Sequence, residues 1–266
     1  MNKTIAQLKK AAKQNLLGHY GSVIGALILT LLFGIVLSIP FSTMTQQGLY
    51  YGVFSRVILG YAGTLIVSLV TLIFGAGLSH IHLQIARGQE TKWSELFYTF
   101  RNRPDRYIGF GLLEILLSVA CIAPGYLCMM PFLLTDDVAT VSTIGLAALG
   151  AALLVAGCII LIIVAYSWSM TTFILLDDDN IRVTDAIRES RRLMRGRKWK
   201  FFVLSLSFIG WLLFSILTCF VGLLWILPYM TQAQTCFYLD LLPETSQHEE
   251  SGDFDQSQTY RYGNYQ

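Results

Sequence analysis

The basic residues of this chain gather in a few short segments, and the sequence between those segments is almost continuously apolar. Of the nineteen lysine and arginine residues, four precede the first apolar run, and five and eight lie in two polar loops. A membrane-spanning helix needs about 20 apolar residues, and several of the runs are long enough. This arrangement predicts a chain that crosses a membrane several times.

The overall composition agrees with a membrane location. Hydrophobic residues make up 54% of the 266 residues and charged residues only 14%, whereas a soluble domain carries about 25% charged residues. The first apolar run, residues 20–39, is too long for the core of a cleavable signal peptide and lacks a clear cleavage site. We therefore expect it to remain as an uncleaved membrane anchor.

Six membrane-spanning segments are expected. They are residues 20–40, 57–86, 107–134 and 141–176, and two more within residues 201–242, with a tight turn near residues 218–222. A single long tilted helix with an interfacial segment is the alternative for the last run. With six spans, the basic loops alternate with nearly uncharged ones, so the positive-inside rule predicts that both termini are cytoplasmic. Five spans would place the C-terminus outside.

Residues 1–242 are predicted to form one membrane domain from three weakly similar units, 1–86, 91–176 and 182–242. Residues 94–97 and 184–187 both read as a capping hydroxyl, an acid and two apolar residues, and residues 4–7 form a capping box. Gly196 stands where a C-cap glycine is expected. The expected fold class is an all-α membrane protein with about six transmembrane helices in three hairpins, each preceded by a basic amphipathic interfacial helix.

Residues 243–266 differ from the rest of the chain. They carry five acidic residues against one arginine, together with glutamine, serine and tyrosine throughout. A segment of this composition cannot bury a core. We expect a disordered cytoplasmic tail.

Small residues recur at every fourth position inside the expected spans. Ala148, Ala152 and Ala156 form such a face in the fourth span. Helices in lipid associate by close packing at faces of this kind. We expect this face to pack within the bundle, and a dimer motif is the alternative.

Glu114 is the one clear acid expected inside the membrane, seven residues into the third span. An ionisable group in hydrocarbon is costly, so it is a candidate functional residue. It would suit a proton-coupled transporter. In the alternative interpretation, Glu114 extends to the membrane surface or pairs with a nearby arginine.

The basic helix expected over residues 184–200 is a candidate surface for anionic lipids. Such headgroups attract basic residues by about 1 kcal/mol per charge near the surface. Nucleic acid is not an expected partner, because its recognition requires more than a basic patch. The expected lipid contacts are Arg188, Arg191, Arg192, Arg195, Arg197, Lys198 and Lys200.

No catalytic site, metal site or cofactor is expected. His80 and His82 are two residues apart, so they point to different faces of a helix, and we interpret them as interfacial residues bonded to backbone or headgroups. The acidic run at residues 177–179 is interpreted as a solvated turn rather than a metal site, because no partner ligands are evident. The five cysteines lie in apolar runs and show no zinc or redox spacing.

Several short sequences in the C-terminal third resemble a known family. They are residues 186–196 (AIRESRRLMRG), 206–211 (LSFIGW), 227–229 (LPY) and 237–238 (FY). They resemble a bacterial family of integral membrane proteins, domain of unknown function 975, and the likeness extends over nearly the whole chain. The layout is also similar to the membrane domain fused to some glycerophosphodiester phosphodiesterases, whose phosphodiesterase domain has no counterpart in these residues. The resemblance implies a bacterial cytoplasmic membrane protein and assigns no catalytic residues.

We therefore expect a non-enzymatic multi-pass protein of the bacterial cytoplasmic membrane that serves as an accessory, scaffold or envelope-homeostasis protein. Its expected partners are the lipid bilayer, anionic lipids and a second membrane protein, and the pattern does not determine the oligomeric state. A small permease or lipid-handling transporter that uses Glu114 is the alternative. An intramembrane enzyme has only the likeness of layout in its favour.

Overall fold

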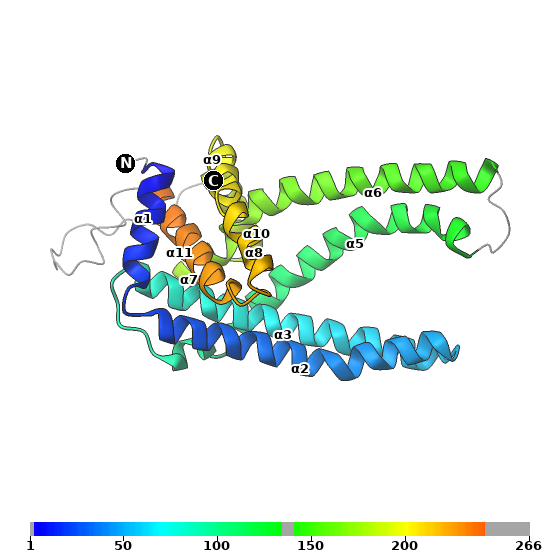
Figure 1. The fold of residues 1–266 in the computed structure, drawn as a ribbon, viewed down its shortest axis with the longest axis horizontal. Helices are drawn as coiled ribbons and strands as arrows, with labels where there is room; N and C mark the ends of the chain where they lie inside the picture. The colour runs from blue at the N-terminus through cyan, green and yellow to red at the C-terminus, as the bar shows by residue number, and fades with distance from the viewer. Residues whose placement is uncertain (1–2, 135–140, 243–266) are drawn as a thin grey trace.

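The computed structural model describes residues 3–134 and 141–242, and all regular structure within these ranges is helical. Two long helical hairpins extend from one end of the molecule, where the shorter helices gather (Figure 1). The predicted class, an all-α membrane protein, is confirmed. In chain order the helices are α1 (Ile5–Leu16), α2 (Tyr20–Tyr50), α3 (Phe54–Ala86), the 3-10 helix η1 (Trp93–Phe97), α4 (Tyr98–Arg101), α5 (Pro104–Leu134), α6 (Val141–Trp168), α7 (Thr171–Asp177), α8 (Val183–Leu193), α9 (Lys198–Leu206), α10 (Ile209–Leu217) and α11 (Leu223–Leu241).

Helices α2 and α3 form the first hairpin. The span predicted to end at Pro40 continues as helix to Tyr50. A Cβ atom added to Gly60 of α3 would lie 2.8 Å from the carbonyl oxygen of Phe41, and one added to Gly63 would overlap the Phe41 ring. These glycines let the part of α2 beyond Pro40 lie directly against α3, so packing holds the helix together although proline lacks an N–H donor.

Helices α5 and α6 form the second hairpin, which is also held by glycine contacts. A Cβ atom added to Gly157 of α6 would lie 2.3 Å from the carbonyl oxygen of Cys121 on α5. One added to Gly125 of α5 would lie 3.0 Å from the carbonyl oxygen of Gly150. The two backbones therefore approach more closely than larger residues would allow.

The face of α6 that packs on α5 is not the one predicted. Gly150 and Gly157 are buried in the hairpin, whereas Ala148, Ala152 and Ala156 are all exposed. The prediction that the alanine face packs within the bundle is therefore wrong for the described chain. Glycine at the contact permits a closer backbone approach than alanine does, which explains the choice of face.

The third unit consists of shorter helices that lie across the first two hairpins. The predicted turn near residues 218–222 is confirmed, because α10 ends at Leu217 and α11 begins at Leu223. In Figure 1, α9, α10 and α11 run steeply across the long axis that α2 and α3 follow. The third unit is therefore not a copy of the first two in its orientation.

Five segments of the described chain are long and apolar enough to cross a membrane. Helix α11 is not one of them, and Gln232 and Asp240 within it are both buried in the protein. The sixth span therefore stays a prediction. The five segments are Tyr20–Tyr50, Phe54–Ala86, Pro104–Phe132, Ile144–Asp177 and Lys198–Leu217.

The hydrophobic core lies at the end where the short helices gather. Buried side chains from α1, α3, α5, α7, α8, α9 and α11 meet in one cluster, so residues from all three sequence units contribute to it. Burial of apolar area is the main favourable contribution of such a core. Its largest fully buried side chains include Tyr107, Met170, Phe208, Phe237 and Tyr238.

Helix α1 begins as predicted, and its apolar stripe packs into the protein core. The capping box is present: the Thr4 hydroxyl accepts a hydrogen bond from the Gln7 N–H at 3.4 Å, and the Gln7 side chain accepts one from the Thr4 N–H at 2.8 Å. Leu8, Ala12 and Leu16 of its apolar stripe are fully buried in the protein core. A position of α1 at the membrane interface stays a prediction.

The starts of the second and third units differ from one another. Residues 94–97 lie in the five-residue η1, which α4 follows. Helix α8 begins at Val183 rather than after a Thr184 cap, and no side chain caps it. Gly196, beyond its end, has φ +75°, the left-handed conformation of a C-cap glycine.

Candidate functional site

A carboxylate at the end of α7 joins the end of α3 to α11. One oxygen of Asp177 lies 2.9 Å from the guanidinium of Arg87, which follows α3. The Tyr238 hydroxyl of α11 donates a hydrogen bond of 2.5 Å to the other oxygen. The Asp177 and Arg87 side chains are only 20% and 21% exposed, so water screens the pair incompletely. The interpretation of this residue as part of a solvated turn is wrong, because it joins helices.

Arg106 at the start of α5 makes a second link to the same acidic run. Its side chain is 3% exposed. It donates a hydrogen bond of 2.7 Å to the carbonyl oxygen of Asp178 and one of 3.1 Å to the carboxylate of Asp179. Arginine side chains therefore bind the acidic residues 177–179. Among the described residues, no three metal-ligating side chains gather in one place.

The two histidines of α3 are bonded within the protein. His82 is fully buried, and its Nδ1 lies 2.6 Å from the side-chain oxygen of Gln232 on α11. The ring of His80 stacks on Tyr98 with centroids 3.9 Å apart, and its Nε2 lies 3.5 Å from the Glu95 carboxylate. The interpretation that they bond to backbone or headgroups is wrong, because the side chains of neighbouring elements hold both.

The structure divides the seven predicted lipid contacts among different surroundings. Arg188 and Arg192 point to solvent from α8, and each has a carboxylate partner one turn away. Arg188 lies 3.0 Å from Asp185, and Arg192 lies 2.6 Å from Glu189. These exposed pairs contribute little to stability, and each partly neutralises the charge that would attract a headgroup.

Two more of the predicted contacts are bonded to the C-terminal part of α6. The guanidinium of Arg191 lies 5.7 Å from the centre of the Trp168 ring, within the range of a cation–π contact. The Lys198 ammonium donates a hydrogen bond of 2.5 Å to the Ser167 hydroxyl. Both cations therefore fix the α8–α9 segment to α6.

The remaining three predicted contacts meet in one pocket between the α8–α9 turn and the start of α1. The carboxylate of Asp240 on α11, which is 1% exposed, binds two residues of this pocket. It accepts hydrogen bonds of 3.1 Å from the Lys3 N–H and from the Lys200 ammonium. The pocket has a volume of about 490 Å³ and is lined by Lys3, Thr4, Arg195, Gly196, Arg197 and Lys200. We call it the cationic pocket.

Lys3 and Thr4 were missed as members of this pocket. The sequence contained a local indication of an anion-attracting site, because Lys3 directly precedes the capping box. This position places a cation beside the positive end of a helix. What no local pattern reveals is that α1 starts beside a turn almost two hundred residues later in the chain.

A further contact holds α1 against the third unit. The Lys9 ammonium donates hydrogen bonds to the carbonyl and hydroxyl oxygens of Ser207, at 3.3 and 3.2 Å, and lies 4.5 Å from the centre of the Phe208 ring. Burial lowers the pKa of the Lys9 side chain. This contact occupies the break between α9 and α10, where the Ser207 carbonyl is available to it.

The model of the family described as "Protein of unknown function (DUF975)" matches residues 1–244. The chain belongs to this family. The matched region includes every helix of the described DUF975 chain and all members of the cationic pocket. No curated protein and no solved structure matches the chain. The similarity in layout to the membrane domain of glycerophosphodiester phosphodiesterases stays a prediction.

Glu114 of the DUF975 chain lies apart from these groups. It is half-buried on α5, where its backbone carbonyl accepts a hydrogen bond of 2.8 Å from the Ser118 hydroxyl. Within residues 3–134 and 141–242, no arginine pairs with its carboxylate, so the ion pair of the alternative interpretation is not formed there. The permease alternative gains no support from these surroundings.

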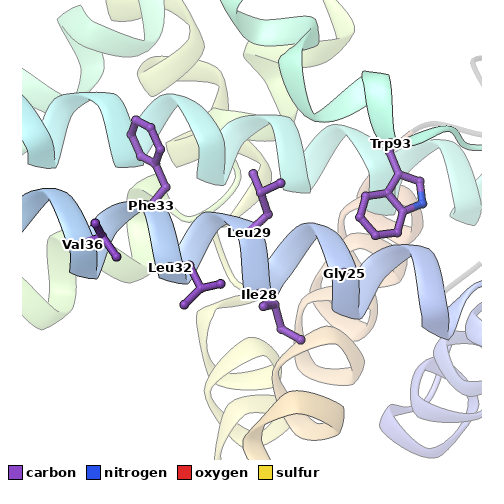
Figure 2. Close-up of a pocket in the computed structure, with 7 residues that line it drawn as sticks. All are labelled: Gly25, Ile28, Leu29, Leu32, Phe33, Val36 and Trp93. Carbon is purple, nitrogen blue, oxygen red and sulfur yellow. The ribbon is translucent and has the colours of Figure 1, made fainter.

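An apolar groove of about 540 Å³ follows one side of α2 in this family member (Figure 2). Trp93 of η1 covers one end, where its ring lies so close to Gly25 that an added Cβ atom would be 2.4 Å from it. Selective ligand sites combine apolar walls with a few polar groups, and this lining supplies almost none. The lining residues are Gly25, Ile28, Leu29, Leu32, Phe33, Val36 and Trp93.

Proposed function

We propose that this DUF975 chain is a non-enzymatic accessory or scaffold protein of the bacterial cytoplasmic membrane that holds a second membrane protein. The observation that carries the proposal is the exposed alanine face of α6, formed by Ala148, Ala152 and Ala156. Small residues let two helices approach closely in lipid, where van der Waals packing drives association. The α5–α6 hairpin also diverges from α2 and α3 toward its tip (Figure 1), which leaves α6 open to another helix.

The exposed arginines of α8 support an additional contact of the same protein with anionic lipids. A basic surface beside a membrane attracts anionic headgroups. Arg195, in the turn that follows α8, contributes most to this argument, because it is exposed and no carboxylate of the described chain pairs with it. An accessory role in envelope homeostasis is compatible with contacts to both lipid and protein.

Recovery of a partner protein from native membranes tests the scaffold role. We expect a tagged protein in mild detergent to retain a stoichiometric membrane protein, and Ala152→Leu to lower its recovery about tenfold, because the larger side chain keeps the helices apart. Ala151→Leu is the matched control, since Ala151 is also exposed on α6 but points about 100° away from Ala152 around the helix. Equal recovery with the two variants, or no stoichiometric partner at all, would contradict the proposal.

The proposed orientation places both ends of the chain in the cytoplasm. The Lys3 N–H lies 3.1 Å from the Asp240 carboxylate, so the two ends of the described membrane domain meet on one side. That side carries most of the lysines and arginines, which favours the cytoplasm under the positive-inside rule.

Reporter fusions at the C-terminus check this orientation. We expect a fused green fluorescent protein to be fluorescent and a fused alkaline phosphatase to be inactive, because the first folds in the cytoplasm and the second outside it. A fusion after Tyr50, at the tip of the α2–α3 hairpin, should give the opposite pair of results. An active phosphatase at the C-terminus would rule the orientation out.

A further inference from the structure

The cationic pocket is a built site rather than a patch of scattered charges. Asp240, with its side chain 1% exposed, accepts hydrogen bonds from the Lys3 backbone and the Lys200 ammonium. This buried carboxylate fixes the start of α1 beside the start of α9. The Lys3 backbone and the Lys200 ammonium are therefore held in place by a buried group of the protein.

Two cations of the pocket have no carboxylate partner among the described residues. The lining of the pocket includes Lys3, Arg195, Arg197 and Lys200, and the carboxylate of Asp240 balances Lys200. Neither the Lys3 ammonium nor the Arg195 guanidinium is paired with a carboxylate in the described ranges. On the exposed face of α8, by contrast, Arg188 and Arg192 both have a partner in their own helix.

The backbone adds further positive potential at the same place. Helix α1 starts directly after Thr4, and α9 starts directly after Arg197, so the positive ends of two helix dipoles lie at the pocket. Gly196 has φ +75°, and a Cβ atom added to it would meet nothing within 4 Å. A ligand can therefore reach the turn between α8 and α9 without meeting a side chain there.

We propose that the cationic pocket binds a phosphate group. Phosphate carries up to two negative charges and offers several acceptor oxygens, which suits a guanidinium that donates two parallel hydrogen bonds together with ammonium groups that act as point charges. The volume of about 490 Å³ is within the usual range of small-molecule sites, about 300 to 1,000 Å³. The phosphate belongs either to an anionic lipid headgroup or to a soluble phosphate compound.

Two double variants separate a specific site from general attraction. Lys3→Gln with Arg195→Gln removes two charges from the pocket, and Lys10→Gln with Arg182→Gln removes two charges from the same two parts of the chain outside it. All four residues are exposed, so both variants are expected to fold and to elute like the parent protein. General electrostatic attraction falls equally in both, whereas site binding falls only in the first.

Titration calorimetry of the purified full chain in mild detergent provides the measurement. One arm uses inorganic phosphate and the other uses short-chain phosphatidic acid, with short-chain phosphatidylcholine as the reference. We expect saturable binding of one molecule per chain, weakened on the order of thirtyfold in the pocket variant and less than about threefold in the control variant. Tighter binding of phosphatidic acid identifies a lipid headgroup, and tighter binding of inorganic phosphate identifies a soluble compound.

The proposal is overturned if neither probe binds saturably to the parent protein, or if the two double variants lose affinity equally. The result does not depend on the scaffold role, because the titration contains no partner protein. Failure to recover a partner from membranes would leave the phosphate isotherms unchanged, so the two proposals are tested separately.

Discussion

Replacing Gly77 with alanine is expected to destabilise the protein by about 2 to 3 kcal/mol, which lowers the apparent melting temperature by about 5 to 10 °C. The new Cβ atom would lie 2.1 Å from the carbonyl oxygen of Leu96 and 2.9 Å from its carbonyl carbon. These are backbone atoms of η1, and Leu96 is only 2% exposed. Unlike the end of a flexible side chain, they can move only if η1 shifts away from α3.

Gly75 provides the matched control in the same helix. A Cβ atom at this position meets nothing within 4 Å, so Gly75→Ala adds helix propensity without a clash. We expect it to be neutral or to stabilise the protein by about 0.5 kcal/mol. Thermal unfolding of both variants in detergent, followed by size-exclusion recovery, gives the comparison. Equal melting temperatures for the two variants would show that η1 does not pack closely on α3.

Replacing Asp177 with asparagine is expected to cost about 2 kcal/mol. Asparagine still accepts the Tyr238 hydrogen bond, but it removes the negative charge that faces Arg87 at 2.9 Å. Both charged groups are about one-fifth exposed, so the loss is smaller than for a fully buried pair and larger than for a surface pair. The measurement is the same detergent melting curve.

The neighbouring Asp178 separates this effect from a general effect of charge. Its side chain is exposed and accepts the Asn180 N–H at 2.8 Å, a bond that asparagine keeps, and Arg106 binds its backbone carbonyl instead. Asp178→Asn should therefore change stability by less than about 0.5 kcal/mol. If the two substitutions had equal effects, the Asp177–Arg87 ion pair would contribute no more to the free energy of unfolding than an exposed charge does.

The sequence alone predicted those structural features that depend only on residues close together in the chain. The long apolar runs predicted the helices of the two hairpins, the Thr4 to Gln7 spacing predicted the capping box, and the turn after Leu217 was placed correctly. Each rests on hydrogen bonds or periodicity within a few residues, so the order of amino acids is enough to reveal it.

The cationic pocket was partly predictable from the sequence and partly decided by the tertiary structure. Arg195, Arg197 and Lys200 were predicted as anion contacts from their charge alone, and the structure brings them together in the cationic pocket. Their separation from Arg188, which pairs with Asp185, was not predictable from charge. A helical periodicity places residues on a face, but it does not state which acid or which helix that face meets.

Contacts between distant segments were decided by the tertiary structure alone. Lys3 meets Asp240 across 237 residues, and Tyr238 meets Asp177 across 61. The tertiary structure alone also shows that α6 packs on α5 through Gly150 and Gly157 rather than through its alanine face. Local sequence determines which segments become helices and which are apolar enough for lipid. How those helices cross, and hence which charges meet in a pocket, depends on packing among all of them at once.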